Sequence, residues 1–247
     1  PNIDDVGKIR ENRGYLIVPN PMLLPEYAYN FELGLTKYLK KEKNYISVQG
    51  FTTLISRHIG RNNYPIFSDQ TTTSNSTILY NGEELITLAN NNLGNRYMLG
   101  TSLDGNIFFT DKISLKGDFN IINALKNEQY GPLPSISPVF LNLFINYEKE
   151  KWFASLRYQY SGSKNPEEYS LGGEDGLEET PIISESQGIY AGTPAWSELS
   201  FLSQFSWNEN GKITIGLENI FDVHYRSFAS GVSAPGRNLR LGLNLKF

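Results

Sequence analysis

The last ten residues, Asn238-Leu239-Arg240-Leu241-Gly242-Leu243-Asn244-Leu245-Lys246-Phe247, decide how this chain folds. Leucine or phenylalanine occupies every second position, and the positions between them hold Asn, Arg, Gly, Asn and Lys. Because side chains of a β-strand alternate between its two faces, the pattern predicts a strand with one apolar and one polar face. A slip of one residue would turn every leucine to the polar side, so the register of this strand is strongly specified.

Eight further segments show the same alternation of apolar and polar residues. They are residues 26–36, 44–58, 95–110, 112–126, 138–148, 152–163, 197–208 and 212–225. Segment 44–58 is ambiguous, since two sets of apolar residues, Ile46, Val48 and Leu54 against Tyr45, Phe51 and Ile55, compete for its apolar face. No stretch shows a convincing 3.6-residue period of an amphipathic helix. The sequence therefore predicts an all-β, antiparallel fold of nine strands.

Composition narrows the classes of function. The chain has 247 residues, no cysteine and two histidines, which excludes disulfides, thiolate zinc sites and cysteine catalysis and leaves little for a histidine metal centre. The net charge of -4 argues against a nucleic-acid partner, because such domains usually carry a basic face. No run of 18 apolar residues occurs, so a transmembrane helix is not expected. We expect no cofactor and no resident metal.

Strand length and loop length together favour a membrane barrel. Many segments run to ten residues or more, whereas soluble strands average about five or six and a strand tilted across a bilayer needs about 9–11. Short charged turns alternate with long polar excursions, the longest at 59–94 and 166–194. Short turns on one side and long loops on the other are typical of an outer-membrane barrel. A soluble β-sandwich, with exposed tryptophans binding a glycan, is the alternative.

The number of strands predicts a fragment. Counting back nine strands from a periplasmic C-terminus places residue 1 on the extracellular side. Bacterial single-chain barrels close with an even number of strands, and an open edge in lipid leaves unpaired backbone groups that each cost several kcal/mol. We therefore expect a piece of a larger barrel, unless the count is wrong by one.

Two groups of motifs resemble a known family. The stretch Gly216-Leu217-Glu218-Asn219-Ile220-Phe221-Asp222-Val223-His224-Tyr225, then Pro235-Gly236-Arg237 and a strand ending in Phe247, resembles the C-terminal end of TonB-dependent receptors. The family reads N-[LI]-[FL]-D-x-x-Y, a loop, P-G-R and a final strand with a terminal aromatic residue. Upstream, Asn20-Pro21-Met22-Leu23-Leu24-Pro25-Glu26 is similar to the family segment N-P-x-L-K-P-E, with Leu24 standing where a lysine is usual.

The resemblance implies both an architecture and partners. Family members are 22-stranded barrels with an N-terminal plug, and they import scarce nutrients with energy from the inner-membrane TonB complex. Residues 1–247 would then be the last nine strands, with the plug and the TonB-contacting segment outside this chain. The resemblance also implies that the barrel assembly machinery reads the C-terminal strand and that lipid surrounds the barrel. The ligand stays open among an iron chelate, haem, cobalamin, a peptide and a glycan.

The motif residues have physical roles that do not involve catalysis. Phe247 ends an outward apolar row, where an aromatic ring suits the membrane–water interface. Pro235 and Gly236 predict a turn before the final strand. We expect Asn219 and Asp222 to cap the bend where the preceding strand leaves the membrane, and Arg237 to hold the loop.

Ligand contacts are expected in the long loops. Arg57, His58, Arg61 and Tyr64 lie near the extracellular end of a predicted strand, where they suit an anionic siderophore or haem. The second long loop carries a group of carboxylates that suggests Ca²⁺ but lacks the spacing of an EF-hand; they are Glu167, Glu168, Glu174, Asp175, Glu178, Glu179 and Glu185. We predict no metal site there, only a solvated acidic loop.

An enzyme is the remaining alternative. Outer-membrane proteases and phospholipases are built on smaller barrels, and they need catalytic groups at the barrel rim. The chain has no G-x-S-x-G motif, and neither His58 nor His224 has an evident serine or acid partner in the sequence. We therefore predict a receptor and no catalytic residue.

Overall fold

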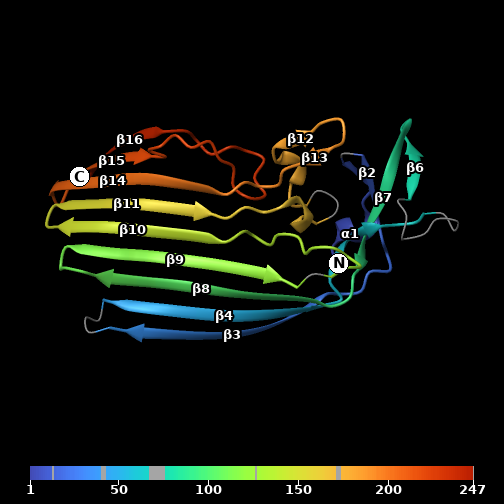
Figure 1. The fold of residues 1–247 in the computed structure, drawn as a ribbon, viewed down its shortest axis with the longest axis horizontal. Coiled ribbons are helices and arrows are strands. Elements are labelled where there is room, and N and C mark those ends of the chain that lie inside the picture. Colours follow the sequence, from blue (N-terminus) through green and yellow to red (C-terminus); the bar gives the residue numbers. More distant parts are fainter. Residues whose placement is uncertain (13, 40–42, 67–75, 126, 171–173, 247) are drawn as a thin grey trace.

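The computed structural model describes the chain apart from residues 13, 40–42, 67–75, 126, 171–173 and 247, so the expected role of Phe247 falls outside the described residues. A long antiparallel sheet forms the body of the molecule (Figure 1). Its nine strands, in sequence order, are β3 (Tyr27–Tyr38), β4 (Tyr45–Ser56), β8 (Arg96–Phe108), β9 (Ile113–Ala124), β10 (Phe140–Lys149), β11 (Trp152–Ser161), β14 (Trp196–Asn208), β15 (Gly211–Glu218) and β16 (Asn238–Leu245). The predicted all-β fold of nine strands is confirmed.

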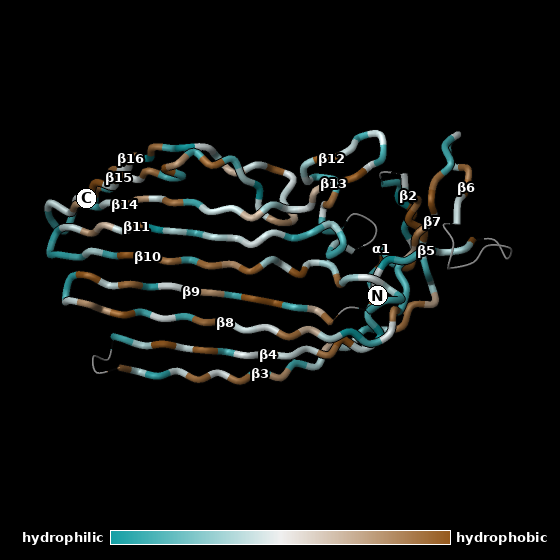
Figure 2. Tube along the Cα trace, viewed as in Figure 1, coloured by the Kyte–Doolittle hydropathy of each residue, from teal (hydrophilic) through white to brown (hydrophobic). Residues whose placement is uncertain are grey.

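The pairing register gives the sheet one continuous apolar face. Leu241 of β16 lies opposite Ile215 of β15, and Leu156 of β11 lies opposite both Phe201 of β14 and Ile145 of β10. Because directly paired residues point to the same side, the apolar sets of neighbouring strands join into one surface. Figure 2 shows the resulting alternation of hydrophobic and hydrophilic residues along the strands.

The apolar face is exposed, whereas the opposite face carries a hydrogen-bonded polar layer. Leu239, Leu241 and Leu243 are 63%, 70% and 65% exposed. On the other face, the side chains of neighbouring strands are linked across the sheet, as where the Asn142 amide donates to Asp118 at 2.9 Å and Gln159 donates to Asn142 at 2.7 Å. A soluble sandwich would bury the leucines against a second sheet. No such sheet covers them among the described residues, so the sandwich alternative is rejected.

The register also resolves the ambiguous strand β4. Ile46, Val48 and Leu54 share the face of the exposed apolar row, since their partners include Leu35 and Tyr29 of β3. Tyr45, Phe51 and Ile55 therefore point to the polar face. The Phe51 ring lies over Gly100 of β8, whose missing side chain leaves room for it.

Short and long connections lie at opposite ends of the sheet. Figure 1 shows the C-terminus beside the tight β10–β11 and β14–β15 turns at one end, and the N-terminus among the long connections at the other. We call the second end the loop end. The structure thus has the predicted alternation of connection lengths.

The long connections hold more structure than the sequence predicted. A second sheet at the loop end joins β1 (Arg10–Asn12), β2 (Tyr15–Val18), β5 (Ile59–Asn63), β6 (Thr77–Tyr80) and β7 (Glu83–Asn92), with β2 parallel to β7. The loop between β11 and β14 contains the 3₁₀ turns η1 (Pro166–Glu168) and η2 (Leu177–Glu179) and the hairpin β12 (Ile182–Ser184) and β13 (Ile189–Tyr190). A five-residue helix, α1 (Ile3–Gly7), is capped reciprocally by Asn2 and Asp5.

The largest difference from the predicted strand boundaries lies at the end of β15. Strand β15 ends at Glu218, seven residues before the predicted end at 225, because Asn219 and Asp222 have the positive φ angles of 49° and 56°. Asparagine and aspartate tolerate this left-handed region better than other residues with side chains, and they turn the chain there. No helix of the described part of the chain is long and apolar enough to cross a membrane, a finding that concerns helices alone.

Leu243→Arg and Asn244→Arg form a matched test of the two faces. They place the same charge at adjacent positions of β16, on the apolar and the polar face respectively. A cation facing lipid costs up to about 2–4 kcal/mol, depending on its depth in the bilayer, whereas a cation on the polar face stays hydrated. In the full-length protein we expect Leu243→Arg to lower the amount of heat-modifiable barrel in outer membranes and Asn244→Arg to leave it unchanged. Equal amounts of folded barrel for both variants would contradict the assignment of the faces.

Candidate ligand-binding site

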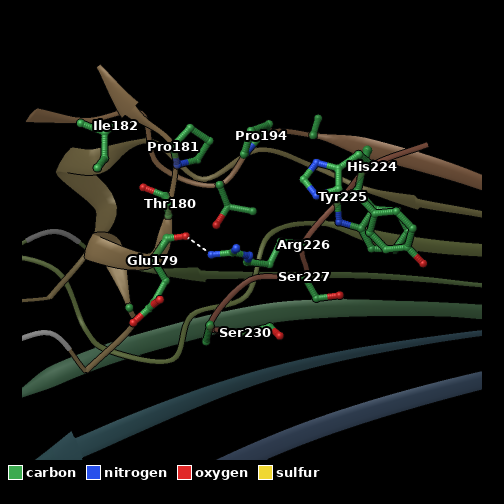
Figure 3. Close-up of a pocket in the computed structure, with 15 residues that line it drawn as sticks. Glu179, Thr180, Pro181, Ile182, Pro194, His224, Tyr225, Arg226, Ser227 and Ser230 are labelled. Carbon is green, nitrogen blue, oxygen red and sulfur yellow. Dashed lines mark hydrogen bonds between the residues drawn. The ribbon is translucent and has the colours of Figure 1, made fainter. Parts of the chain in front are cut away.

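A pocket of about 430 Å³ lies at the loop end, between the β11–β14 and β15–β16 loops. One side consists of Glu179, Thr180, Pro181 and Ile182, and Figure 3 shows His224 and Tyr225 on the other side, with Arg226 extending across towards Glu179. The Arg226 guanidinium donates a hydrogen bond to the backbone carbonyl of Glu179. The pocket volume falls in the range of about 300–1,000 Å³ that is usual for small-molecule sites.

An aromatic pair forms one wall of the pocket. The ring of Tyr225 stacks on that of Trp196, the first residue of β14, with centroids 4.0 Å apart and planes at 23°. Trp196 is only 8% exposed, and burial also raises the pKa of the Tyr225 hydroxyl. The stack connects the β15–β16 loop to the end of the sheet.

The Asn219–Asp222 turn fixes the loop that carries Tyr225. The buried Asn219 amide donates to the carbonyls of Val223 and Pro235 at 2.9 and 3.1 Å, and its oxygen accepts from the Val223 amide at 2.9 Å. Asp222 accepts from the Arg237 amide at 2.7 Å. A single asparagine side chain thus closes both ends of a loop of about fifteen residues.

Gly236 leaves room for the Asp222 carboxylate in the same turn. A Cβ atom at this position would lie 2.8 Å from the Asp222 carboxylate oxygen, closer than real contacts allow. The P-G-R segment therefore supplies a glycine so that the Asp222 carboxylate can approach the backbone, together with the Arg237 amide that this carboxylate binds. The side chain of Phe221, by contrast, is 71% exposed, and it belongs to the outer surface.

A buried ion pair lies beneath the neighbouring loops. Lys164 Nζ lies 3.5 Å from Asp175, donates to the Ile136 carbonyl at 2.7 Å and sits 4.1 Å from the centroid of the Phe228 ring. Asp175 accepts from the Ser135 amide at 2.7 Å. Burial lowers the pKa of Lys164, and the negative charge of Asp175 opposes that shift. These contacts join three loops into one unit.

Hydrogen bonds hold the upstream motif, residues 20–26, against β7. Asn20 is buried, and its amide donates to the Asn90 carbonyl and the Asn91 side chain of β7 at 2.9 and 3.1 Å. Asn92 both donates to and accepts from the Leu24 backbone, at 3.0 and 2.8 Å. The run Asn90-Asn91-Asn92 was not identified from the sequence, although three asparagines in a strand are unusual. It fixes the segment that contains Pro21 and Pro25.

Glu26 and His58 link the upstream motif to the segment that follows β4 of the long sheet. Glu26 Oε2 accepts from the Ile59 amide at 2.6 Å and lies 2.9 Å from His58 Nδ1. Burial lowers the pKa of His58; the carboxylate of Glu26 opposes that shift, and the charge of Arg96 adds to it. His58 therefore acts in this structure as a buried hydrogen-bonding group.

The four residues predicted to contact ligand do not meet in the pocket of Figure 3. Arg57 is exposed, Arg61 lies 3.6 Å from Glu174, and Tyr64 pairs through its backbone with Thr87. Whether any of them touches a ligand stays a prediction. The sequence did not identify Trp196 and Arg226 as pocket-lining residues. The stack of Trp196 on Tyr225 joins a strand to a loop that is distant in sequence, and such a contact leaves no local pattern.

The carboxylates of the acidic loop have separate partners. Glu168 caps Asn165, Asp175 pairs with Lys164, and Glu174 pairs with Arg61. Burial raises the pKa of Glu174, although the charge of Arg61 opposes that shift. Within the described residues, no group of three acidic or histidine side chains is arranged to hold a metal ion.

Comparison with known proteins supports the same reading of the fold. Residues 5–220 match the family described as "TonB dependent receptor-like, beta-barrel". The chain belongs to this family. The long sheet is therefore part of the wall of a receptor-type β-barrel. Membership of this family implies an outer-membrane location.

Solved structures of receptors and transporters have the same fold. The copper transporter OprC is 16% identical with a TM-score of 0.66, matched over 91% of this chain and 32% of its own. A mutant of the ferric enterobactin receptor PfeA from Pseudomonas aeruginosa is 15% identical with a TM-score of 0.69, over 94% and 33%. The siderophore receptor PirA from Acinetobacter baumannii is 17% identical with a TM-score of 0.67, over 94% and 33%. The chain thus spans about a third of their length, and no curated protein matches it.

Asn219→Ala should open the β15–β16 loop. The substitution removes three hydrogen bonds, two of which the Asn219 amide donates to the carbonyls of Val223 and Pro235, and each contributes about 0.5–1.5 kcal/mol. In the full-length receptor we expect faster proteolysis within 219–237, measured by mass spectrometry. Asn244→Ala, on the exposed final strand, is the matched control and should leave the cleavage rate unchanged. Equal protection of the loop in both variants would refute its dependence on Asn219.

Acidification should destabilise the region around the Glu26–His58 hydrogen bond. The neutral form of His58 is favoured in the fold, so its contribution to stability is complete above the ordinary histidine pKa of about 6.5 and is lost as the pH falls towards the lowered pKa. We expect the protection factor of the Ile59 amide, measured by hydrogen exchange, to fall between pH 7.5 and 5.5. His58→Gln should remove most of this pH dependence. A protection factor independent of pH in the unsubstituted receptor would contradict the prediction.

Proposed function

We propose that this chain forms part of an outer-membrane receptor that takes up a scarce nutrient with TonB-coupled energy. The observation that carries the proposal is the sheet itself, which has an exposed apolar face, a polar opposite face and all its long loops at one end. An apolar band of this kind suits lipid, and a polar face suits a wet or protein-filled lumen. The family match supports the same class of protein.

The two edges of the sheet support a larger closed barrel. Among the described residues, β3 pairs only with β4 and β16 only with β15, so each leaves one edge of backbone groups unpaired. Such edges are costly in lipid. We propose that residues 1–247 supply nine C-terminal strands of a 22-stranded barrel, and that other strands pair with both edges.

The proposed partners follow from this arrangement. The plug and the TonB-contacting segment would belong to an N-terminal part, the barrel assembly machinery would read the C-terminal strand, and lipid would cover the apolar face. Nutrient would enter at the loop end, where Arg57 presents an exposed cation and Tyr64 a partly exposed ring. Transport of this kind is a conformational process, so no residue of the chain is proposed to make or break covalent bonds.

The proposal predicts a TonB-dependent uptake defect. We expect a strain that lacks the full-length receptor to lose uptake of one nutrient from a panel of ferric chelates, haem, cobalamin and copper complexes. A strain that lacks TonB should lose the same uptake. Arg57→Glu at the loop end should reduce uptake severalfold, whereas Lys212→Glu at the opposite end should not.

Two results would contradict the proposed function. One is uptake that continues undiminished without TonB, because the energy source would then be different. The other is identical uptake of every nutrient tested, with and without the receptor, under limitation for each of those nutrients. The amount of folded receptor in the membrane is measured in parallel for each variant.

A further inference from the structure

The pocket of Figure 3 contains a buried donor that the protein leaves unused. Trp196 is 8% exposed and lines the pocket, and its Nε1–H group has no hydrogen-bond acceptor among the described residues. Native proteins pair most of their buried donors, because an unpaired one costs about 1–3 kcal/mol. The Nε1 atom itself has almost no accessible surface, so a ligand acceptor reaches it only if the surrounding side chains move.

The pocket also contains a cation with spare donors. Arg226 uses its Nη1 group on the Glu179 carbonyl, and it forms no ion pair with any described carboxylate. A guanidinium has five N–H donors in a planar fork that matches a carboxylate. The side chain is held across the pocket by the Glu179 carbonyl, and the carboxylate of the same Glu179 also belongs to the pocket lining.

The remaining lining combines apolar residues with polar side chains, which are Glu179, Thr180, Thr193, His224, Ser227 and Ser230. Pro181, Ile182, Pro194 and Ala195 come from the β11–β14 loop, and the Tyr225 ring comes from the facing loop. Ligand sites typically combine such apolar walls with a few placed polar groups that orient the ligand. The aromatic stack and the Asn219 turn fix the walls before any ligand arrives, which lowers the entropy cost of binding.

We propose that this pocket binds a small organic carboxylate with an apolar body, its carboxylate facing Arg226 and its body against the prolines and the Tyr225 ring. This inference deepens the proposed function, on which it rests for the access of solutes to the loop end. It names one chemical class of ligand for a defined place among the loops.

Binding of 3-phenylpropionate to the purified full-length receptor in detergent tests the proposal. Ligand-observed NMR titration should give saturable binding, and 3-phenylpropionamide, which keeps the shape but lacks the charge, should bind about tenfold more weakly or worse. Arg226→Gln should weaken binding of the acid about tenfold or more. Lys212→Gln, at the far end of the sheet, is the charge-matched control and should leave affinity unchanged.

Ile182→Trp is a second variant that tests the pocket while keeping Arg226, in case the loop does not fold without that arginine. Ile182 is 56% exposed on a hairpin and lines the pocket, so a larger ring there should block the pocket without removing a polar contact. We expect this variant to lose 3-phenylpropionate binding. Non-saturable binding, equal binding of acid and amide, or full affinity in both Arg226→Gln and Ile182→Trp would overturn the proposal.

Probe binding and nutrient uptake are separate readouts. If uptake does not depend on TonB but 3-phenylpropionate still binds and needs Arg226, the proposed function is wrong and the pocket assignment stands. If uptake depends on TonB as predicted but 3-phenylpropionate does not bind, the pocket assignment is wrong and the proposed function stands.

Discussion

The pairing register of nine antiparallel strands is the constraint on which the rest of the structure depends. Each strand alternates apolar and polar residues, and each pairing sets like faces side by side, so that Leu241, Ile215 and Phe201 belong to one surface. An irregularity in the β14–β15 pairing occurs only at the turn end, between Ser206 and Asn208. A shift of one residue anywhere else would put leucines into the polar layer and charges onto the apolar face.

The loop end owes its order to side chains that bind backbone. Asn219 closes the β15–β16 loop, Asn20 and Asn92 fix the upstream motif on β7, and contacts of Lys164 and Asp175 join the β15–β16 loop to the β9–β10 and β11–β14 loops. Such side chain–backbone contacts replace the ladder hydrogen bonds that a strand would supply. The residues that make the family motifs recognisable are therefore loop-building residues, and the pocket lies between the loops that they shape.

The sequence was informative where the pattern is local. Period-two alternation identified all nine strands of the long sheet, and the turn residues of the Asn219 motif marked the bend, although the predicted strand overran Glu218 by several residues. It failed where contacts join distant segments. The second sheet escaped notice because β5 and β7 draw on polar residues, such as Asn90-Asn91-Asn92, that disfavour strands. The stack of Trp196 on Tyr225 and the role of Arg226 depend on loop closure, which no periodicity reports.

The most direct test of the account is the solvent that each face of the sheet meets. Residues 1–247 contain no cysteine, so a cysteine introduced among them adds one nitroxide label at a known position. In the full-length receptor in lipid bilayers, labels at Leu156 and Tyr158 of β11 should be accessible to oxygen and shielded from a water-soluble nickel chelate. Labels at Arg157 and Gln159, on the other face, should be protected from oxygen. Accessibility that does not alternate along β11, or outward positions shielded from both reagents, would contradict the claim that the apolar face meets lipid.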